Sequence, residues 1–173
     1  MKSLTAFNLA DWIDRHRRQL KPPVCNRQVF EEDDFIVMIV GGPNSRKDYH
    51  VDEGPELFYQ IEGDMLLRVV DDGERREIRI AEGEMLLLPP RVPHSPRRFQ
   101  DTVGLVIERK RLEHELDGFL WFCDHCNNKL YEETVYVDDI VNQLPKIFDR
   151  FYQSIDNRRC QECGAVMPLP DDE

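Results

Sequence analysis

Three candidate metal ligands, His50, Glu56 and His94, constrain the fold of this chain more than any other feature. Glu56 begins an apolar run, residues 56–61, that alternates as a strand does. A second strand-like run begins at Gly83 and ends in prolines just before His94, because proline cannot donate to a sheet ladder. Two imidazoles and one carboxylate are the ligand set of non-haem iron(II) oxygenases. The chain must therefore fold so that both runs bring their ligands to one ion.

Short strand-like runs separated by turn residues continue along the chain. Four of them cover residues 35–40, 66–70, 76–80 and 102–109. The middle pair flanks the turn Asp71-Asp72-Gly73, which is a strong hairpin signal. Before the strands, a short helix is expected over residues 9–16, with Asn8 as its N-cap. This pattern predicts a mainly β protein, either a barrel or a sandwich.

Four of the five cysteines form two CxxC pairs late in the chain, Cys123 with Cys126 and Cys160 with Cys163. Each pair makes a compact loop that can place two thiolates on one tetrahedral metal ion. Such spacing indicates metal binding in a reducing compartment better than it indicates a disulfide framework. We therefore predict a second, four-cysteine metal site, and the sequence does not identify its metal.

The composition changes at residue 110, and we divide the chain there. Residues 1–110 hold the N-terminal helix and the barrel with its catalytic ligands. Residues 110–118 are highly charged, as in a linker or a helix. The C-terminal appendage, residues 111–173, carries the cysteines and a helical apolar pattern over residues 140–151, which Pro145 is expected to kink or break. The length suits one domain with a core, so we expect the appendage to pack on the barrel.

The charge distribution limits the possible partners. A formal net charge of −11 argues against a nucleic-acid partner, because binding to phosphates needs a basic surface. Arg46 and Arg98 nevertheless lie close to the candidate ligands in sequence, and we interpret Arg91 and Arg97 as solvated loop charges. The chain has no run of eighteen apolar residues and no apolar N-terminal leader. These features predict a cytoplasmic protein without a membrane partner.

The spacing of the ligands, glycines and prolines resembles the two cupin motifs. The matching residues are His50, Glu56 and Gly63 for the first motif, and Gly83, Pro89 and His94 for the second. Many cupins have another histidine where this chain has Asp52, so a three-ligand site is expected. The resemblance implies a cupin double-stranded β-helix, or jelly-roll barrel, with a short N-terminal helix and a C-terminal helix beside the four-cysteine knuckle.

A narrower resemblance covers nearly the whole chain. It rests on the late CxxC pairs and on the segments Asn26-Arg-Gln-Val, Gly41-Gly-Pro-Asn44, Asp48-Tyr-His50, Phe58-Tyr-Gln60, Leu87-Leu-Pro-Pro90, His94-Ser-Pro96 and Val106-Ile-Glu-Arg109. These segments are similar to those of the bacterial 3-hydroxyanthranilate 3,4-dioxygenases. In that family ferrous iron is the catalytic metal, and the enzyme opens the aromatic ring of 3-hydroxyanthranilate.

The resemblance implies the reaction and its components. Its substrates are 3-hydroxyanthranilate and dioxygen, and its product is 2-amino-3-carboxymuconate semialdehyde, a step of tryptophan catabolism through kynurenine toward quinolinate and NAD. The triad would hold Fe(II), and the four cysteines would form a rubredoxin-like, non-catalytic site for iron or zinc. The family is usually dimeric, so a homodimer is expected.

The substrate carboxylate needs a cationic partner, and arginine's planar fork suits that task. Arg46 and Arg98 each lie four residues from a ligand histidine and share its strand face if the segments are extended. By strand parity Glu108 lies either at an exposed strand end or in a polar cavity, and the resemblance favours the cavity. There it would hydrogen-bond the substrate amine and move protons. By resemblance alone, Glu56 also contacts substrate and Asn26 lies in a loop near substrate or oxygen.

Two alternative functions fit the same motifs. The first is another ring-cleaving cupin with the same metal and a different substrate, which would not need two arginines in its cavity. The second is a non-catalytic ligand-sensing cupin with a zinc ribbon. That module would bind metal without consuming dioxygen.

Overall fold

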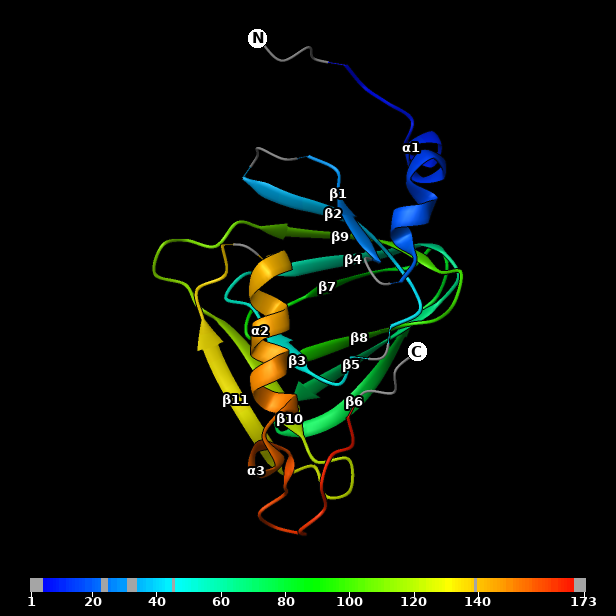
Figure 1. Ribbon diagram of the computed structural model, residues 1–173. Coiled ribbons are helices and arrows are strands. Elements are labelled where there is room, and N and C mark those ends of the chain that lie inside the picture. The colour runs from blue at the N-terminus through cyan, green and yellow to red at the C-terminus, as the bar shows by residue number, and fades with distance from the viewer. Residues whose placement is uncertain (1–4, 23–24, 31–33, 45, 139, 170–173) are drawn as a thin grey trace.

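Two antiparallel sheets form the body of the computed structural model (Figure 1). The first contains β1 (Asn26–Gln28), β2 (Phe35–Gly41), β4 (Glu56–Glu62), β7 (Met85–Leu88) and β9 (Val103–Arg109). The second contains β3 (Tyr49–Val51), β5 (Met65–Asp71), β6 (Glu74–Ile80), β8 (His94–Arg98), β10 (Asp117–Phe122) and β11 (Lys129–Val135). The helical elements are α1 (Leu9–His16), the short 3-10 helix Arg17–Leu20, α2 (Ile140–Tyr152) and α3 (Ile155–Arg158). The structure describes residues 5–22, 25–30, 34–44, 46–138 and 140–169, with only the backbone for 140–142.

The strand order is that of a jelly roll. The five-stranded sheet runs β1-β2-β9-β4-β7 and the six-stranded sheet runs β11-β10-β3-β8-β5-β6. From β3 to β9 the chain passes from one sheet to the other after every strand except β5, which pairs with β6 in a hairpin within the six-stranded sheet. Figure 1 shows the five-stranded sheet above the six-stranded one. The predicted cupin barrel, with its terminal helices, is confirmed.

The capping and turn residues identified in the sequence adopt the structures predicted for them. The Asn8 side chain accepts a hydrogen bond from the backbone N–H of Asp11 at 3.1 Å and so caps α1. The β5–β6 hairpin closes through Asp72 and Gly73, which both have positive φ angles of 50° and 80°. A two-residue turn of this kind matches the right-handed twist of the paired strands.

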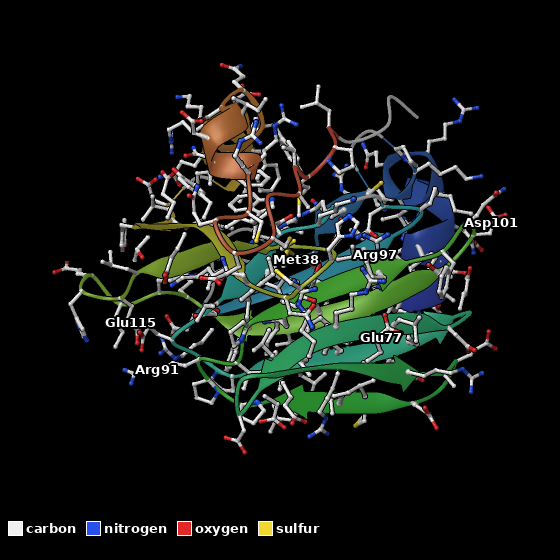
Figure 2. All side chains as sticks on the ribbon, turned by 90° about the horizontal axis from the view of Figure 1, so that it is seen from below. Met38, Glu77, Arg91, Arg97, Asp101 and Glu115 are labelled. Carbon is white, nitrogen blue, oxygen red and sulfur yellow. The ribbon has the colours of Figure 1, made fainter. Side chains whose placement is uncertain are left out.

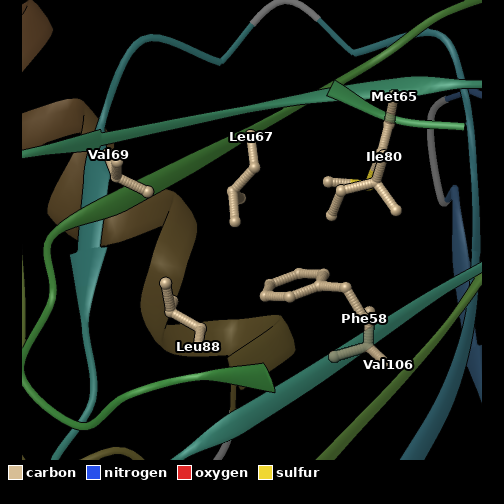
Figure 3. Close-up of a cluster of buried hydrophobic side chains, with 7 residues drawn as sticks. All are labelled: Phe58, Met65, Leu67, Val69, Ile80, Leu88 and Val106. Carbon is tan, nitrogen blue, oxygen red and sulfur yellow. The ribbon is translucent and has the colours of Figure 1, made fainter. Parts of the chain in front are cut away.

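The barrel interior is filled by side chains that alternate inward along strands of both sheets (Figure 3). This cluster consists of Phe58, Met65, Leu67, Val69, Ile80, Leu88 and Val106. Phe58, Met65 and Leu67 are each at most 1% exposed. The cluster occupies one part of the barrel and leaves the part near the ligands for a cavity.

The C-terminal segment is more closely joined to the barrel than the sequence predicted. The charged stretch is a loop only to residue 116, because β10 begins at Asp117 and pairs with β3. Strand β11 follows from Lys129, and α2 continues through Pro145, where a kink or break was expected. Trp121 of β10 stacks on Phe151 of α2 with ring centroids 4.4 Å apart. The division at residue 110 stays a prediction, and the hydrogen-bonded sheet runs across it.

The helices of the described residues include none that is long and apolar enough to span a membrane.

The core prediction concerns Leu67, which is 0% exposed. Leu67→Ala removes buried methyl groups and leaves a cavity, so it should lower the free energy of unfolding by about 2–5 kcal/mol. Leu112, which is 53% exposed, provides the matched control, and Leu112→Ala should change stability by less than about 0.5 kcal/mol. Urea unfolding followed by circular dichroism measures both. Equal effects of the two substitutions would contradict the assignment of Leu67 to the core.

Candidate metal centre and substrate cavity

The structure brings together the three predicted ligands, His50, Glu56 and His94. His50 lies in β3 and His94 begins the neighbouring strand β8, where the two residues are direct cross-strand partners. Glu56 begins β4 in the opposite sheet, and its Oε2 atom lies 2.9 Å from Nε2 of His94. One potential ligand atom from each residue lies within 4.8 Å of the other two. The two sheets therefore present two imidazoles and one carboxylate to a common point.

The donor atoms fit a divalent metal ion. Oε2 of Glu56 is buried and has no hydrogen-bond partner among the described residues, because its close approach to His94 lacks hydrogen-bond geometry. Burial alone would raise the pKa of Glu56, but nearby His94 holds it below its ordinary value. Burial likewise opposes the charge on His94, and Glu56 nevertheless raises the pKa of His94 above its ordinary value. A cation bound by all three side chains would satisfy the orphaned carboxylate oxygen and compensate the buried negative charge.

A cavity of about 470 Å³ opens beside these ligands. Every residue predicted for the site lines it: His50, Glu56, His94, Arg46, Arg98, Glu108 and Asn26. Its apolar walls come from three sources, namely Phe58 and Val106 in the first sheet, Phe119 in the second, and Leu144 and Phe148 in α2. Figure 1 shows α2 in front of strands of both sheets, where it covers this end of the barrel.

The two arginines of the cavity differ in their surroundings. Arg98 is 3% exposed, donates from Nη1 to Gln60 Oε1 at 2.9 Å, and forms no ion pair within the described part of the chain. Burial lowers the pKa of Arg98 to about 10. The Arg46 side chain is 42% exposed, lies over the Phe148 ring at 5.1 Å, and donates from Nε to Asp48 at 3.0 Å. Arg98 is therefore a buried cation available to an anionic ligand, whereas Arg46 already has a carboxylate partner.

Glu108 faces the cavity, as the resemblance implied. It lies on β9 directly opposite Glu56 of β4, and it is 4% exposed. Burial raises the pKa of Glu108 to about 7, although Arg111 opposes the shift by donating to Oε1 at 2.9 Å. A carboxyl group with this pKa exchanges a proton near neutral pH, which is the property of a general acid or base.

A family model described as 3-hydroxyanthranilic acid dioxygenase matches residues 1–152. The chain belongs to this family. The curated 3-hydroxyanthranilate 3,4-dioxygenase of Xanthomonas campestris pv. campestris (strain B100) is 54% identical over 165 residues, which cover 95% of this chain and 93% of that protein. The protein of the same name from Bacillus thuringiensis (strain Al Hakam) is 44% identical over 168 residues, or 96% and 94% of the two chains.

One solved structure with a similar arrangement is a cupin-2 domain containing protein from Shewanella frigidimarina. It has a TM-score of 0.48 and 20% sequence identity, and the match covers 61% of this chain and 95% of that chain.

In this member of the 3-hydroxyanthranilic acid dioxygenase family, sequence reasoning missed two buried residues behind the ligands, Asp117 and Arg111. Oδ2 of Asp117 lies 2.7 Å from Nε2 of His50 and 2.7 Å from Nη2 of Arg111. The Arg111 side chain is 4% exposed and also reaches Glu108 and Asp52. Both residues belong to the charged stretch, residues 110–118, that was interpreted as a linker or a helix. The available signal was the apolar run after Asp117, residues 118–122, which marks a strand beginning there.

Gln60 and Gly104 were also missed, and they create the space for Arg98. Gln60 lies on β4 in line with Glu56 and Phe58, and it accepts the hydrogen bond from Arg98. A Cβ at Gly104 would lie 2.4 Å from both Nη1 of Arg98 and Oε1 of Gln60. Only glycine at this position leaves room for the two polar side chains inside the barrel.

The four cysteines converge as their spacing predicted. Sγ of Cys123 lies 3.6 Å from that of Cys163, and Sγ of Cys126 lies 3.4 Å from that of Cys160. All four sulfur atoms are within 4.8 Å of one another, as a tetrahedral site requires. Each CxxC loop is closed by a residue with positive φ, Asn127 at 64° and Gly164 at 74°.

Arg91 and two further histidines, His16 and His125, do not line the cavity. Arg91 is a surface residue at the periphery (Figure 2), where it donates to Glu53 at 2.6 Å. Nδ1 of His16 lies 2.6 Å from the Trp12 carbonyl at the end of α1. His125 is exposed beside the first cysteine pair. None of these three belongs to either cluster of potential metal ligands found among the described residues.

The site prediction concerns Asp117. Its carboxylate fixes the orientation and tautomer of His50, so Asp117→Asn should weaken divalent-metal binding at the triad about 10- to 100-fold. Metal analysis after dialysis against increasing chelator measures this, and an ion bound by the four cysteines would provide an internal reference. The substitution keeps the side-chain volume, which limits the packing cost. Unchanged metal retention at the triad would show that Asp117 supports only the sheet.

Proposed function

We propose that this protein is a 3-hydroxyanthranilate 3,4-dioxygenase that uses Fe(II) and dioxygen to open the ring of 3-hydroxyanthranilate, giving 2-amino-3-carboxymuconate semialdehyde. Membership of the family and the 54% identical relative of that name support the reaction. One observation carries the substrate class. Arg98 is a buried guanidinium without a carboxylate partner in the described chain, and it shares a cavity with the metal-ligand triad. Such a cavity suits an aromatic acid.

A ferrous ion held by His50, Glu56 and His94 would supply the electron exchange between the aromatic ring and dioxygen, which zinc lacks. The protein's own contribution begins with orientation. Arg98 binds the substrate carboxylate through its planar fork, and the more exposed Arg46 adds a second cation at the cavity. The apolar walls exclude water from the ring. The amine and hydroxyl of the substrate then face the triad.

Glu108 is the residue placed to move a proton. Because its pKa is about 7, it accepts a hydrogen bond from the substrate amine and takes or returns a proton during ring opening without a large energetic cost. Arg111 holds the carboxylate of Glu108 from behind at 2.9 Å. Glu56 contacts the substrate as well as the metal in this proposal, and Asn26 at the cavity lining contributes near the substrate or oxygen.

The four-cysteine site is proposed to be rubredoxin-like and non-catalytic, with iron or zinc as its metal. Four thiolates would fill all positions of a tetrahedral metal ion, so the site offers no open position to a substrate. The five cysteines form no disulfide in the described structure, which suits a cytoplasmic enzyme.

The decisive test is dioxygen consumption by iron-loaded protein with 3-hydroxyanthranilate, recorded together with the near-ultraviolet absorbance of the semialdehyde. We expect both signals to rise together, and we expect them to disappear after removal of the metal and to return with ferrous iron. Zinc should not restore them. Equal activity with zinc would contradict the proposal, and metal binding without oxygen uptake would favour the ligand-sensing alternative.

Arg98→Ala tests the carboxylate assignment. It removes a charge-assisted hydrogen bond worth about 1.5–3 kcal/mol, so kcat/KM should fall about 10- to 100-fold, mostly through KM. Arg98→Lys should recover only part, because an ammonium lacks the bidentate fork. Arg91→Ala, at an exposed arginine, is the matched control and should leave the kinetics unchanged.

The comparison substrate is 2-aminophenol, which is 3-hydroxyanthranilate without its carboxylate. Wild-type protein should process it poorly, and Arg98→Ala should be no worse than wild type toward it. Equal impairment with both compounds would place Arg98 in support of the metal or the fold.

We also propose a homodimer formed through the outer face of the five-stranded sheet. Leu87, Leu57, Ile107 and Val37 form one continuous row across β7, β4, β9 and β2. Leu87 is 63% exposed, and Met85 and Phe35 on the same face are 67% and 59% exposed. Apolar side chains gathered on one sheet face mark an interaction surface, and a second copy of the chain matches it under two-fold symmetry.

Leu87→Asp should therefore shift the protein toward monomer, because it buries a charge in the interface. Sedimentation velocity at micromolar concentration measures the change. Leu112→Asp, at another exposed leucine, is the control and should remain dimeric. A wild-type monomer, or a dimer unaffected by Leu87→Asp, would contradict this surface.

A further inference from the structure

A second cavity, of about 290 Å³, lies on the outer face of the six-stranded sheet. Its cationic side chains are Lys47, Arg68, Arg75 and Arg97, and Asp124 is the one carboxylate among its lining residues. Arg97 and Arg98 are consecutive in β8, so their side chains leave opposite faces of the sheet. The catalytic cavity and this second cavity therefore use the two faces of one strand. Figure 2 shows the position of Arg97 seen from below the molecule.

Two of the four cations lack a carboxylate partner within the described residues. Lys47 pairs with Asp124 at 3.0 Å, and Arg68 pairs with Glu77 at 2.8 Å. Arg97 instead donates to the backbone carbonyl of Arg46 at 2.5 Å. Burial lowers the pKa of Arg97, and the neighbouring charge of Arg68 lowers it further. The cavity thus concentrates unneutralised positive charge in a protein whose formal net charge is −11.

Arg75 is held rigidly at this cavity with a donor left over. Its guanidinium lies over the rings of Tyr49 at 5.5 Å and Phe122 at 5.0 Å. Nη1 donates to Oδ1 of Asn127 at 2.8 Å, whereas Nε is buried without an acceptor among the described residues. A buried, unsatisfied donor on a charged group is costly unless a ligand supplies the acceptor.

We propose that this cavity binds a small phosphate-type oxyanion, either inorganic phosphate or the phosphate group of a monoester. Two arginines without carboxylate partners match a dianion, and guanidinium groups bind phosphate oxygens through directed, charge-assisted hydrogen bonds. A ligand with a single carboxylate would neutralise only one of the two arginines. The positive charge is confined to this cavity, and the protein as a whole is negatively charged. Long-range attraction of an anion by the whole protein therefore plays no part.

The location links the bound anion to the first cysteine pair. Asp124 and Asn127, which contact Lys47 and Arg75, lie within and directly after the Cys123–Cys126 loop. An anion between Arg75 and Arg97 would remove the repulsion of the cations around it and fasten this loop to the sheet. Binding should therefore raise the melting temperature of the metal-loaded protein.

The test is titration of inorganic phosphate into metal-loaded protein at constant ionic strength, followed by isothermal calorimetry and thermal unfolding. We expect saturable binding of one phosphate per chain and a rise in Tm that equal chloride does not produce. Arg75→Gln and Arg97→Gln should each bind phosphate about tenfold more weakly or worse. Arg76→Gln is the matched control: it removes one positive charge from the same strand, at an exposed residue paired with Asp71, and should bind as wild type does.

Arg75→Lys keeps the charge and guards against a folding defect. It should retain its structure by circular dichroism and still lose much of the affinity, because lysine lacks the fork. A parallel titration with glycerol 3-phosphate separates the two sources: tighter binding than phosphate indicates a monoester, and weaker binding indicates the free ion. Absence of saturable binding at millimolar phosphate overturns the proposal. Equal weakening of phosphate binding in Arg76→Gln also overturns it, because that result would indicate charge screening only. The proposal fails as well if the cavity binds only an acidic segment from another chain.

Discussion

A buried guanidinium, Arg111, makes the polar end of this barrel possible. Its side chain lies 3.3 Å or less from carboxylate oxygens of Asp52, Glu108 and Asp117. Each of these carboxylates is at most 4% exposed, and an uncompensated buried charge costs several kcal/mol. The guanidinium offsets that cost for three groups at once, and Asp117 and Glu108 raise the pKa of Arg111 above its ordinary value despite burial. Through Asp117 the network contacts His50, and through Glu108 it reaches the lining of the substrate cavity.

The period of two along each strand then distributes the site. On β4 the inward positions are Glu56, Phe58 and Gln60, and on β8 they are His94, Pro96 and Arg98. Both strands place a potential metal ligand at one end and an apolar side chain in the middle, and at the other end Arg98 of β8 donates a hydrogen bond to Gln60 of β4. Four residues of extended strand span about 13 Å, and the long Arg98 side chain can bring its guanidinium closer than that to the metal ligands. The potential metal ligands and the guanidinium of Arg98 therefore line one cavity.

The sequence predicted the parts of the site that depend on local spacing. The triad followed from two strand ends, and Arg98 followed from parity with His94. Strand parity did not decide whether Glu108 is exposed or faces a cavity, because a polar residue in an apolar strand gives the same sequence pattern in both cases. The apolar run after Asp117 indicated a strand, but the contact of Asp117 with His50 could not be predicted locally, since it spans 67 residues and requires β10 to pair with β3. The need for glycine at position 104 could not be predicted from the sequence either, because it arises from the space that Arg98 and Gln60 occupy in the folded barrel.

The C-terminal segment is part of this arrangement through two different links. One is the continuous sheet, in which Phe119 of β10 lies opposite His50 and its ring stacks on the imidazole at 5.2 Å. The other is the aromatic packing of Trp121 on Phe151, which holds α2 so that Phe148 lines the cavity. The cysteine pairs follow β10 on one side and α3 on the other, so a metal bound by all four cysteines would close a loop that contains α2. Closing that loop would limit how far α2 can move from the barrel, and the shape of the cavity would then depend on four cysteines that do not line it.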